Sequence, residues 1–167
     1  LNAIDKATTT VATEVTTLHN AGAQHIIVLN LPPIGDTPFM NKNKDLKNLG
    51  NMASSMFNLG LTSKLNALSF KANIFDVHTL FTTITKDIDT NKQYTEPNTT
   101  LTLTNDTNPS CTDSSKNAMQ LAINCKHWAP VDQQAQDLFA DAIHPSDTTH
   151  QILAIHLEKF LSSAAVK

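Results

Sequence analysis

The sequence predicts an α/β fold in which helices flank a parallel β-sheet. Segments with helical spacing of apolar residues alternate with short apolar runs, which is the order expected of strand–helix–strand units with right-handed crossovers. The first run, residues 26–29, is entirely apolar and has three β-branched side chains. Such runs are typical of parallel strands buried on both faces. The 167 residues are enough for one domain with a hydrophobic core.

The chain begins with a predicted helix, a strand and a stiff loop. Residues 3–21 place apolar side chains at three- and four-residue spacing, which predicts a helix that ends at Gly22. The strand follows, and the loop after it, residues 31–38, contains prolines and a glycine. Ligands bind at the carboxyl ends of the strands in open α/β sheets. Pro32 and Pro33 are therefore candidate substrate-binding residues.

Two more helices and a second strand come next. Residues 43–68 have one apolar face, but Gly50 and Gly60 lower the helix propensity, so we expect a kink or a break. Residues 72–77 predict the second strand, and residues 78–89 return to helical spacing.

Regular periodicity is absent from about residue 90 to residue 132, which we interpret as an exposed excursion with a short strand at Leu101 and Leu103. Cys111 and Cys125 flank a polar stretch within it. In a secreted protein they would form a disulfide, worth about 3 kcal/mol in the chain-entropy model, and in a cytosolic protein they would be two free thiols. The many Thr, Ser and Asn residues and the low charge favour secretion.

The composition argues against nucleic-acid binding, because the net charge is -3 and the 12 basic residues are all lysine. No apolar run approaches the length of a transmembrane segment. The chain opens on Leu1 rather than methionine, and its first residues already have helical spacing. We therefore expect it to be cut from a longer polypeptide, whose removed part is a candidate place for a signal peptide.

The end of the chain contains the arrangement that points to chemistry. A short apolar run, residues 138–140, predicts the final strand, and Asp141 and His144 follow it on the connection to a last amphipathic helix. Pro145 keeps His144 out of the helical conformation, and Ser146 is a good helix N-cap. A histidine on a turn beside a carboxylate suits a general base whose tautomer is set by that carboxylate, as a serine nucleophile requires.

This turn has two other interpretations. An Asp and a His three residues apart near a helix start are common and often structural. Asp141, His144 and His150 also suggest a metal site, but no further cluster of ligand residues appears in the sequence, so we rank it low. We expect no metal and no cofactor.

Three pieces of the chain together resemble the C-terminal half of GDSL lipases, the SGNH hydrolase family. They are residues 22–38, 57–61 and 138–145, which read GAQHIIVLNLPPIGDTP, FNLGL and LFADAIHP. The similarity is closest to the bacterial secreted phospholipase A, lysophospholipase and glycerophospholipid–cholesterol acyltransferase branch. In that branch a cysteine pair often precedes the final Asp-x-x-His-Pro block.

The resemblance implies a fold and roles for two residues. Residues 1–167 would be the C-terminal portion of one SGNH hydrolase domain, which has a flavodoxin-like three-layer parallel sheet flanked by helices. His144 would be the catalytic base and Asp141 the acid that orients it. The family usually has Trp before this Asp and often Thr after His-Pro, where this chain has Ala140 and Ser146. Neither difference touches the proposed chemistry.

The nucleophile of the family is absent from this sequence. In the family it lies in a Gly-Asp-Ser block, and a Gly and an Asn from two other blocks form the oxyanion hole; none of the three blocks is present here. The serines in or beside residues 43–68 have no glycine turn to expose them. We expect that the missing N-terminal half of the protein supplies these groups, and that this chain alone is inactive. The strand at residues 26–29 would then have an unpaired edge.

The resemblance implies hydrolysis of lipid esters, or acyl transfer to an alcohol, by a secreted bacterial enzyme. A carbohydrate or small-ester esterase ranks lower, because the aromatic content of 5% leaves few platforms for sugar stacking. A non-catalytic binding or assembly module on the same scaffold is the alternative from a different class. The missing serine favours that alternative, and the intact Asp141–His144 turn argues against it.

Overall fold

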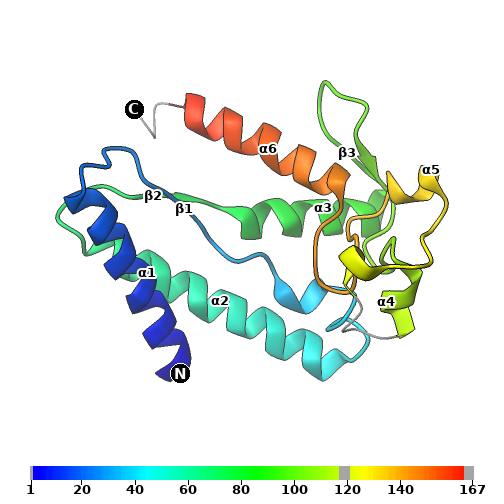
Figure 1. Ribbon diagram of the computed structural model, residues 1–167, viewed down its shortest axis with the longest axis horizontal. Coiled ribbons are helices and arrows are strands. Elements are labelled where there is room, and N and C mark those ends of the chain that lie inside the picture. The colour runs from blue at the N-terminus through cyan, green and yellow to red at the C-terminus, as the bar shows by residue number, and fades with distance from the viewer. Residues whose placement is uncertain (1, 117–120, 164–167) are drawn as a thin grey trace.

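The computed structural model describes residues 2–116 and 121–163 and has helices on both faces of a small parallel sheet (Figure 1). The sheet consists of β1 (Ile27–Leu29) and β2 (Asn73–Phe75), which pair in parallel. Two long helices cover each face. They are α1 (Asn2–Asn20) and α2 (Lys44–Asn66) on one face, and α3 (Val77–Asn91) and α6 (Asp147–Ser162) on the other.

Alternate side chains of the two strands enter different hydrophobic clusters. Val28 and Ile74, which are register partners, pack into the cluster formed with α1 and α2. Ile27 and Phe75 pack into the larger cluster formed with α3 and α6, where Ile84 is fully buried. This alternation follows from the two-residue period of a strand and places the sheet between the two helical layers. The predicted α/β layering is therefore confirmed.

The sheet has only two strands in the described residues, so it does not establish a full flavodoxin-like sheet. β1 pairs with β2 along one edge, and its other edge has no partner strand in the part of the chain that the structure describes. Leu29 is 43% exposed, so the prediction that this strand is buried on both faces is wrong for that residue.

The long helix α2 is continuous, and the predicted break at its glycines is wrong. Gly50 serves close packing instead. A Cβ added there would lie 2.8 Å from the backbone nitrogen of Gly35, in the 3-10 helix η1 (Ile34–Asp36). The loop after β1 therefore rests directly on α2 because neither side has a side chain at the contact. By contrast, Gly60 faces Thr8 of α1 at an ordinary contact distance of 3.4 Å. No helix within the described ranges has the length and apolar character needed to cross a bilayer.

The excursion after α3 is less exposed than the composition suggested. It contains a small antiparallel hairpin, and the predicted strand at Leu103 is confirmed within it. Glu96 is fully buried and accepts hydrogen bonds from Tyr94, His156 and Lys159, which join the hairpin to α6. The elements of the excursion are β3 (Tyr94–Thr95), β4 (Thr102–Leu103), α4 (Thr112–Lys116), the 3-10 helix η2 (Ala122–Asn124) and α5 (Val131–Gln134).

The predicted final strand at residues 138–140 does not form. This segment makes only isolated bridges, Asn105 with Asp137 and Phe139 with Pro145, and it joins neither sheet. The carbonyl groups of Phe139 and Ala140 accept instead from the N–H groups of Ser110 and Cys111 in the excursion. The chain then reverses at once, which leaves no length for a ladder.

The packing of α2 on the loop after β1 gives the first prediction. Gly50→Ala should lower the free energy of unfolding by about 1–3 kcal/mol, because the new methyl group must displace the backbone of Gly35. The matched control Gly60→Ala should be neutral or stabilising by up to about 1 kcal/mol, because alanine is the better helix former and space exists at that site. Urea unfolding followed by circular dichroism compares the two. Equal stability of both variants would contradict the close approach.

Candidate active site

The predicted Asp141–His144 turn is a tight reversal that leads into α6. The N–H of Ala140 donates to the carbonyl of His144 at 2.8 Å, and the N–H of Ser146 donates to the carbonyl of Leu138 at 2.9 Å. Ser146 is the N-cap of α6 and its hydroxyl accepts from the N–H of Thr149, as predicted. The start of the helix therefore fixes the backbone position of His144, which lies two residues before the N-cap.

The carboxylate of Asp141 is buried at the centre of this turn, with its side chain 2% exposed. Its Oδ1 accepts the backbone N–H groups of Ile143 at 2.9 Å and His144 at 2.8 Å. Its Oδ2 accepts the backbone N–H of Ala122, at 2.8 Å, from the excursion. Both oxygens lie 3.0 Å from Nδ1 of His144. Three amides and one imidazole thus surround a single carboxylate.

Two opposing effects act on the pKa of Asp141. Burial raises the pKa, because it disfavours the charged form, while the hydrogen bonds from the amides of His144, Ala122 and Ile143 and from the His144 side chain lower it. The hydrogen bonds prevail, and the pKa lies below its ordinary value. Asp141 is therefore ionised at neutral pH. An ionised carboxylate only accepts, so it holds the proton of a neutral imidazole on Nδ1 and leaves Nε2 as the basic nitrogen.

The imidazole of His144 is open to solvent, with 58% of its side chain exposed. Within the described residues its Nε2 makes no hydrogen bond, whereas Nδ1 faces Asp141. Nδ1 is thus held by the buried carboxylate of Asp141, and Nε2 faces the solvent. A general base needs this arrangement, since Nε2 must meet a hydroxyl that approaches from outside.

The loop with the two prolines lies between α2 and this turn. Polar side chains on one stripe of α2 hold its backbone: Asn58 Oδ1 accepts from the N–H of Leu31, and Asn51 Oδ1 accepts from the N–H of Gly35. Beyond η1, the N–H of Phe39 donates to the carbonyl of Ala142 at 2.9 Å. The loop is therefore beside the candidate base. Pro33 is buried and Pro32 is partly buried, and their contact with substrate stays a prediction.

An open cavity of about 450 Å³, most of whose lining residues have polar groups, lies at the carboxyl ends of β1 and β2 and was not predicted from the sequence. Its lining includes Asn30 and Asp76, which directly follow the two strands. Asn30 donates to Asp76 at 2.8 Å. Burial raises the pKa of Asp76, but hydrogen bonds from Thr79 and Asn30 and the charge of His78 bring it below its ordinary value. Polar residues immediately after two apolar runs were the signal that could have revealed this cavity.

Serine side chains near these groups do not complete a triad. Ser54 is fully buried, where its hydroxyl donates to the carbonyl of Gly50 and accepts from the N–H of Ile34. Ser55 and Ser63 line this open cavity, but the carboxylate of Asp76 there is bonded to Asn30 and Thr79. No serine hydroxyl in the described ranges is hydrogen bonded to His144.

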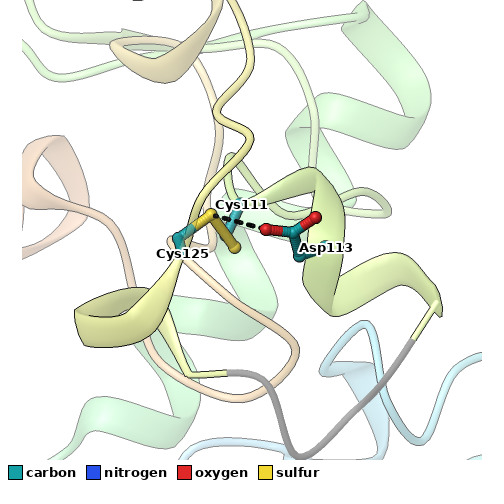
Figure 2. Close-up of side chains that lie close together, drawn as sticks. All are labelled: Cys111, Asp113 and Cys125. Atoms are coloured by element: carbon teal, nitrogen blue, oxygen red, sulfur yellow. Dashed lines mark hydrogen bonds between the residues drawn. A yellow bond between two sulfur atoms is a disulfide. The ribbon is translucent and has the colours of Figure 1, made fainter.

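Cys111 and Cys125 form a disulfide, so the alternative of two free thiols is wrong for this structure. Asp113 lies against the disulfide, as Figure 2 shows. Cys111, Asp113 and Cys125 are also the only group of three potential metal ligands found among the described residues. Their two sulfur atoms are bonded to each other, so they offer no thiolate to a metal ion. Asp141, His144 and His150 do not come together as a ligand group among the described residues, and Nδ1 of His150 lies 2.8 Å from the carbonyl of Ser146.

Comparison with protein families found a family model that matches most of the chain. The family model described as GDSL-like Lipase/Acylhydrolase matches residues 2–157, which include both helical layers, the disulfide and the Asp141–His144 turn. A search among curated proteins found no match.

The pKa of Asp141 leads to a prediction about acid stability. Its folded-state pKa is depressed, so the ionised carboxylate stabilises the fold fully above its unfolded-state pKa, and this contribution is lost as pH falls through the folded-state pKa. Asp141→Asn lacks the ionised form at every pH. The difference in unfolding free energy between the protein and Asp141→Asn should therefore be constant above about pH 5 and should shrink as the pH falls below about 4. Urea unfolding at a series of pH values measures it, and a difference independent of pH would contradict the assignment.

Proposed function

Because the chain belongs to the GDSL-like lipase/acylhydrolase family, we propose that it carries the base and the acid of a Ser-His-Asp triad in a serine ester hydrolase. The observation that carries the proposal is the two-sided environment of His144. Nδ1 is held by the buried carboxylate of Asp141, and Nε2 is open to solvent. The pair Asp113–His127 also has an exposed imidazole, but its carboxylate is 27% exposed, whereas the side chain of Asp141 is 2% exposed.

The chemistry follows from these two nitrogens. Nε2 of His144 accepts the proton of a serine hydroxyl as the serine oxygen bonds to the ester carbonyl carbon. The imidazolium that results is stabilised by Asp141 through Nδ1. When the carbon–oxygen bond of the ester breaks, Nε2 returns the proton to the leaving alcohol, and an acyl-enzyme remains. Water, activated by the same nitrogen, releases the acid, or an alcohol takes the acyl group instead.

The nucleophile of this triad comes, in our proposal, from a polypeptide segment with a Gly-Asp-Ser block, together with the Gly and Asn of the oxyanion hole. The open edge of β1 in the described residues supports this proposal, because the unpaired N–H and C=O groups of an edge strand are where another strand pairs. The chain without that segment is expected to be inactive.

The substrate class in this proposal is a lipid ester, as for a lysophospholipase or phospholipase A, with acyl transfer as a second outcome of the same acyl-enzyme. It is supported by the family and by the resemblance of the three quoted pieces to the phospholipase and acyltransferase branch. We also propose that the protein is secreted from a bacterium. The Cys111–Cys125 disulfide supports this, because disulfides persist in oxidising compartments.

Substitutions in the enzyme that contains the serine-bearing segment test the triad. His144→Ala should reduce kcat by about 10⁴-fold or more. Asp141→Asn should reduce kcat by about 10⁴-fold, because the wrong tautomer of the His144 imidazole is then favoured. His150→Ala is the matched control and should keep activity close to that of the unmodified enzyme, since His150 binds only the carbonyl of Ser146 among the described residues. Hydrolysis of a lysophospholipid and of a short-chain ester measures both activity and substrate class. Near-full activity of His144→Ala would overturn the proposal.

A further inference from the structure

The excursion reaches back to the candidate acid through one backbone group. Oδ1 of Asp141 is held by the amides of its own turn, but Oδ2 is held by the N–H of Ala122, which lies 19 residues earlier in the chain. Nδ1 of His144 lies 3.0 Å from each oxygen, so the orientation of the imidazole depends on the placement of both. The rotation of the carboxylate about its own axis is thus set by a donor outside the turn.

A closed ring of contacts holds Ala122 in place. Ala122 opens η2, and the N–H of Cys125 donates to its carbonyl at 3.0 Å. Cys125 is joined to Cys111 by the disulfide. The N–H of Cys111 donates to the carbonyl of Ala140 at 2.8 Å, and Ala140 directly precedes Asp141. The ring therefore starts and ends at the same acid, and the disulfide is its one covalent cross-link.

Asp113 reinforces the ring next to the disulfide. Its Oδ2 accepts the backbone N–H groups of Lys126 at 2.8 Å and His127 at 3.0 Å, and Figure 2 shows its carboxylate turned toward the sulfurs. The N–H of Thr112 donates to the carbonyl of His127 at 2.9 Å. The segments on either side of Cys111 and Cys125 are thereby fastened together by backbone contacts as well as by the sulfurs.

Hydrophobic packing does little to hold the part of the ring that carries Ala122. Ile123 is 86% exposed, and Leu121 is exposed as well, whereas Cys111 is fully buried. The disulfide anchors this exposed arm to the buried segment at Cys111. The disulfide restricts the unfolded chain and so favours the closed loop, whereas Leu121 and Ile123 contribute little apolar burial.

We propose that the backbone amide of Ala122 is a positioning group for the carboxylate of Asp141, and that the Cys111–Cys125 disulfide keeps it there. Its catalytic meaning rests on the proposed function, in which Asp141 orients the base. The hydrogen bond and its dependence on the disulfide do not rest on that function and can be tested separately.

Ala122→Pro tests the amide alone. It removes the N–H at the first position of η2, where proline is well tolerated. Leu121 has φ -78° and ψ 155°, which is a conformation compatible with a following proline. Ala122→Ser is the matched control, because it changes the side chain and keeps the amide. Cys111→Ala/Cys125→Ala removes the cross-link and keeps the amide, and the unmodified protein treated with dithiothreitol is a second route to the same state.

The first readout is the pKa of Asp141, followed by carbon-13 NMR of its carboxyl group. Loss of a hydrogen bond to the charged form should raise this pKa in Ala122→Pro, in the double cysteine variant and in the reduced protein, but not in Ala122→Ser. Circular dichroism confirms that each variant is folded. An unchanged pKa in Ala122→Pro would overturn the role of the amide, and an unchanged pKa in the folded double variant would overturn the role of the disulfide.

The second readout is turnover in the enzyme that contains the serine-bearing segment. Ala122→Pro should lower kcat by about tenfold with KM unchanged, because an oriented imidazole matters in the transition state and not in substrate binding. A raised pKa with unchanged kcat would overturn the positioning role. If His144→Ala kept full activity, the proposed function would fail, while the NMR comparison would still decide the contact between Ala122 and Asp141.

Discussion

The buried carboxylate of Asp141 is the interaction on which the rest of this structure depends. A charged group that loses water costs several kcal/mol unless hydrogen bonds replace it. Here three backbone amides and one imidazole replace it, and they come from two separate parts of the chain. Two of these amides, those of Ile143 and His144, belong to the turn, so the carboxylate stabilises the turn that positions His144. The same hydrogen bonds keep Asp141 ionised, and the ionised carboxylate sets the tautomer of His144.

The surrounding helices act as a frame for this turn. The loop after β1 is held to α2 by Asn58, Ser54 and Asn51, which bond its backbone. The loop then bonds Ala142 through Phe39. On the other side, α6 starts at Ser146 and packs its apolar face into the cluster around Phe75 and Ile84. The turn is thus joined to both helical layers at points only a few residues apart.

The irregular excursion is as much a part of the site as the regular elements. Its hairpin is attached to α6 through the buried Glu96, whose charge is met by His156 and Lys159. Its disulfide-linked part returns to Asp141 through Ala122. A segment without periodicity is therefore ordered by polar contacts and a covalent link, which composition does not reveal. The expectation of an exposed excursion is therefore wrong for its buried residues, among them Glu96, Leu103 and Cys111.

Local rules determined much of this protein from the sequence. The four long helices, both parallel strands, the N-cap at Ser146 and the pairing of Asp141 with His144 depend on neighbouring residues, and each was predicted. Long-range contacts decided the rest. Gly50 permits a close approach to Gly35 instead of breaking α2, the expected strand at residues 138–140 is bonded by the excursion, and the third amide on Asp141 belongs to Ala122. Every residue except proline has a backbone N–H, so the sequence does not mark the amide of Ala122 as a donor to Asp141. The contact between Gly50 and Gly35 and the position of the excursion likewise do not follow from any local sequence pattern. Only the packed chain brings these groups together, because their positions depend on everything that lies between them.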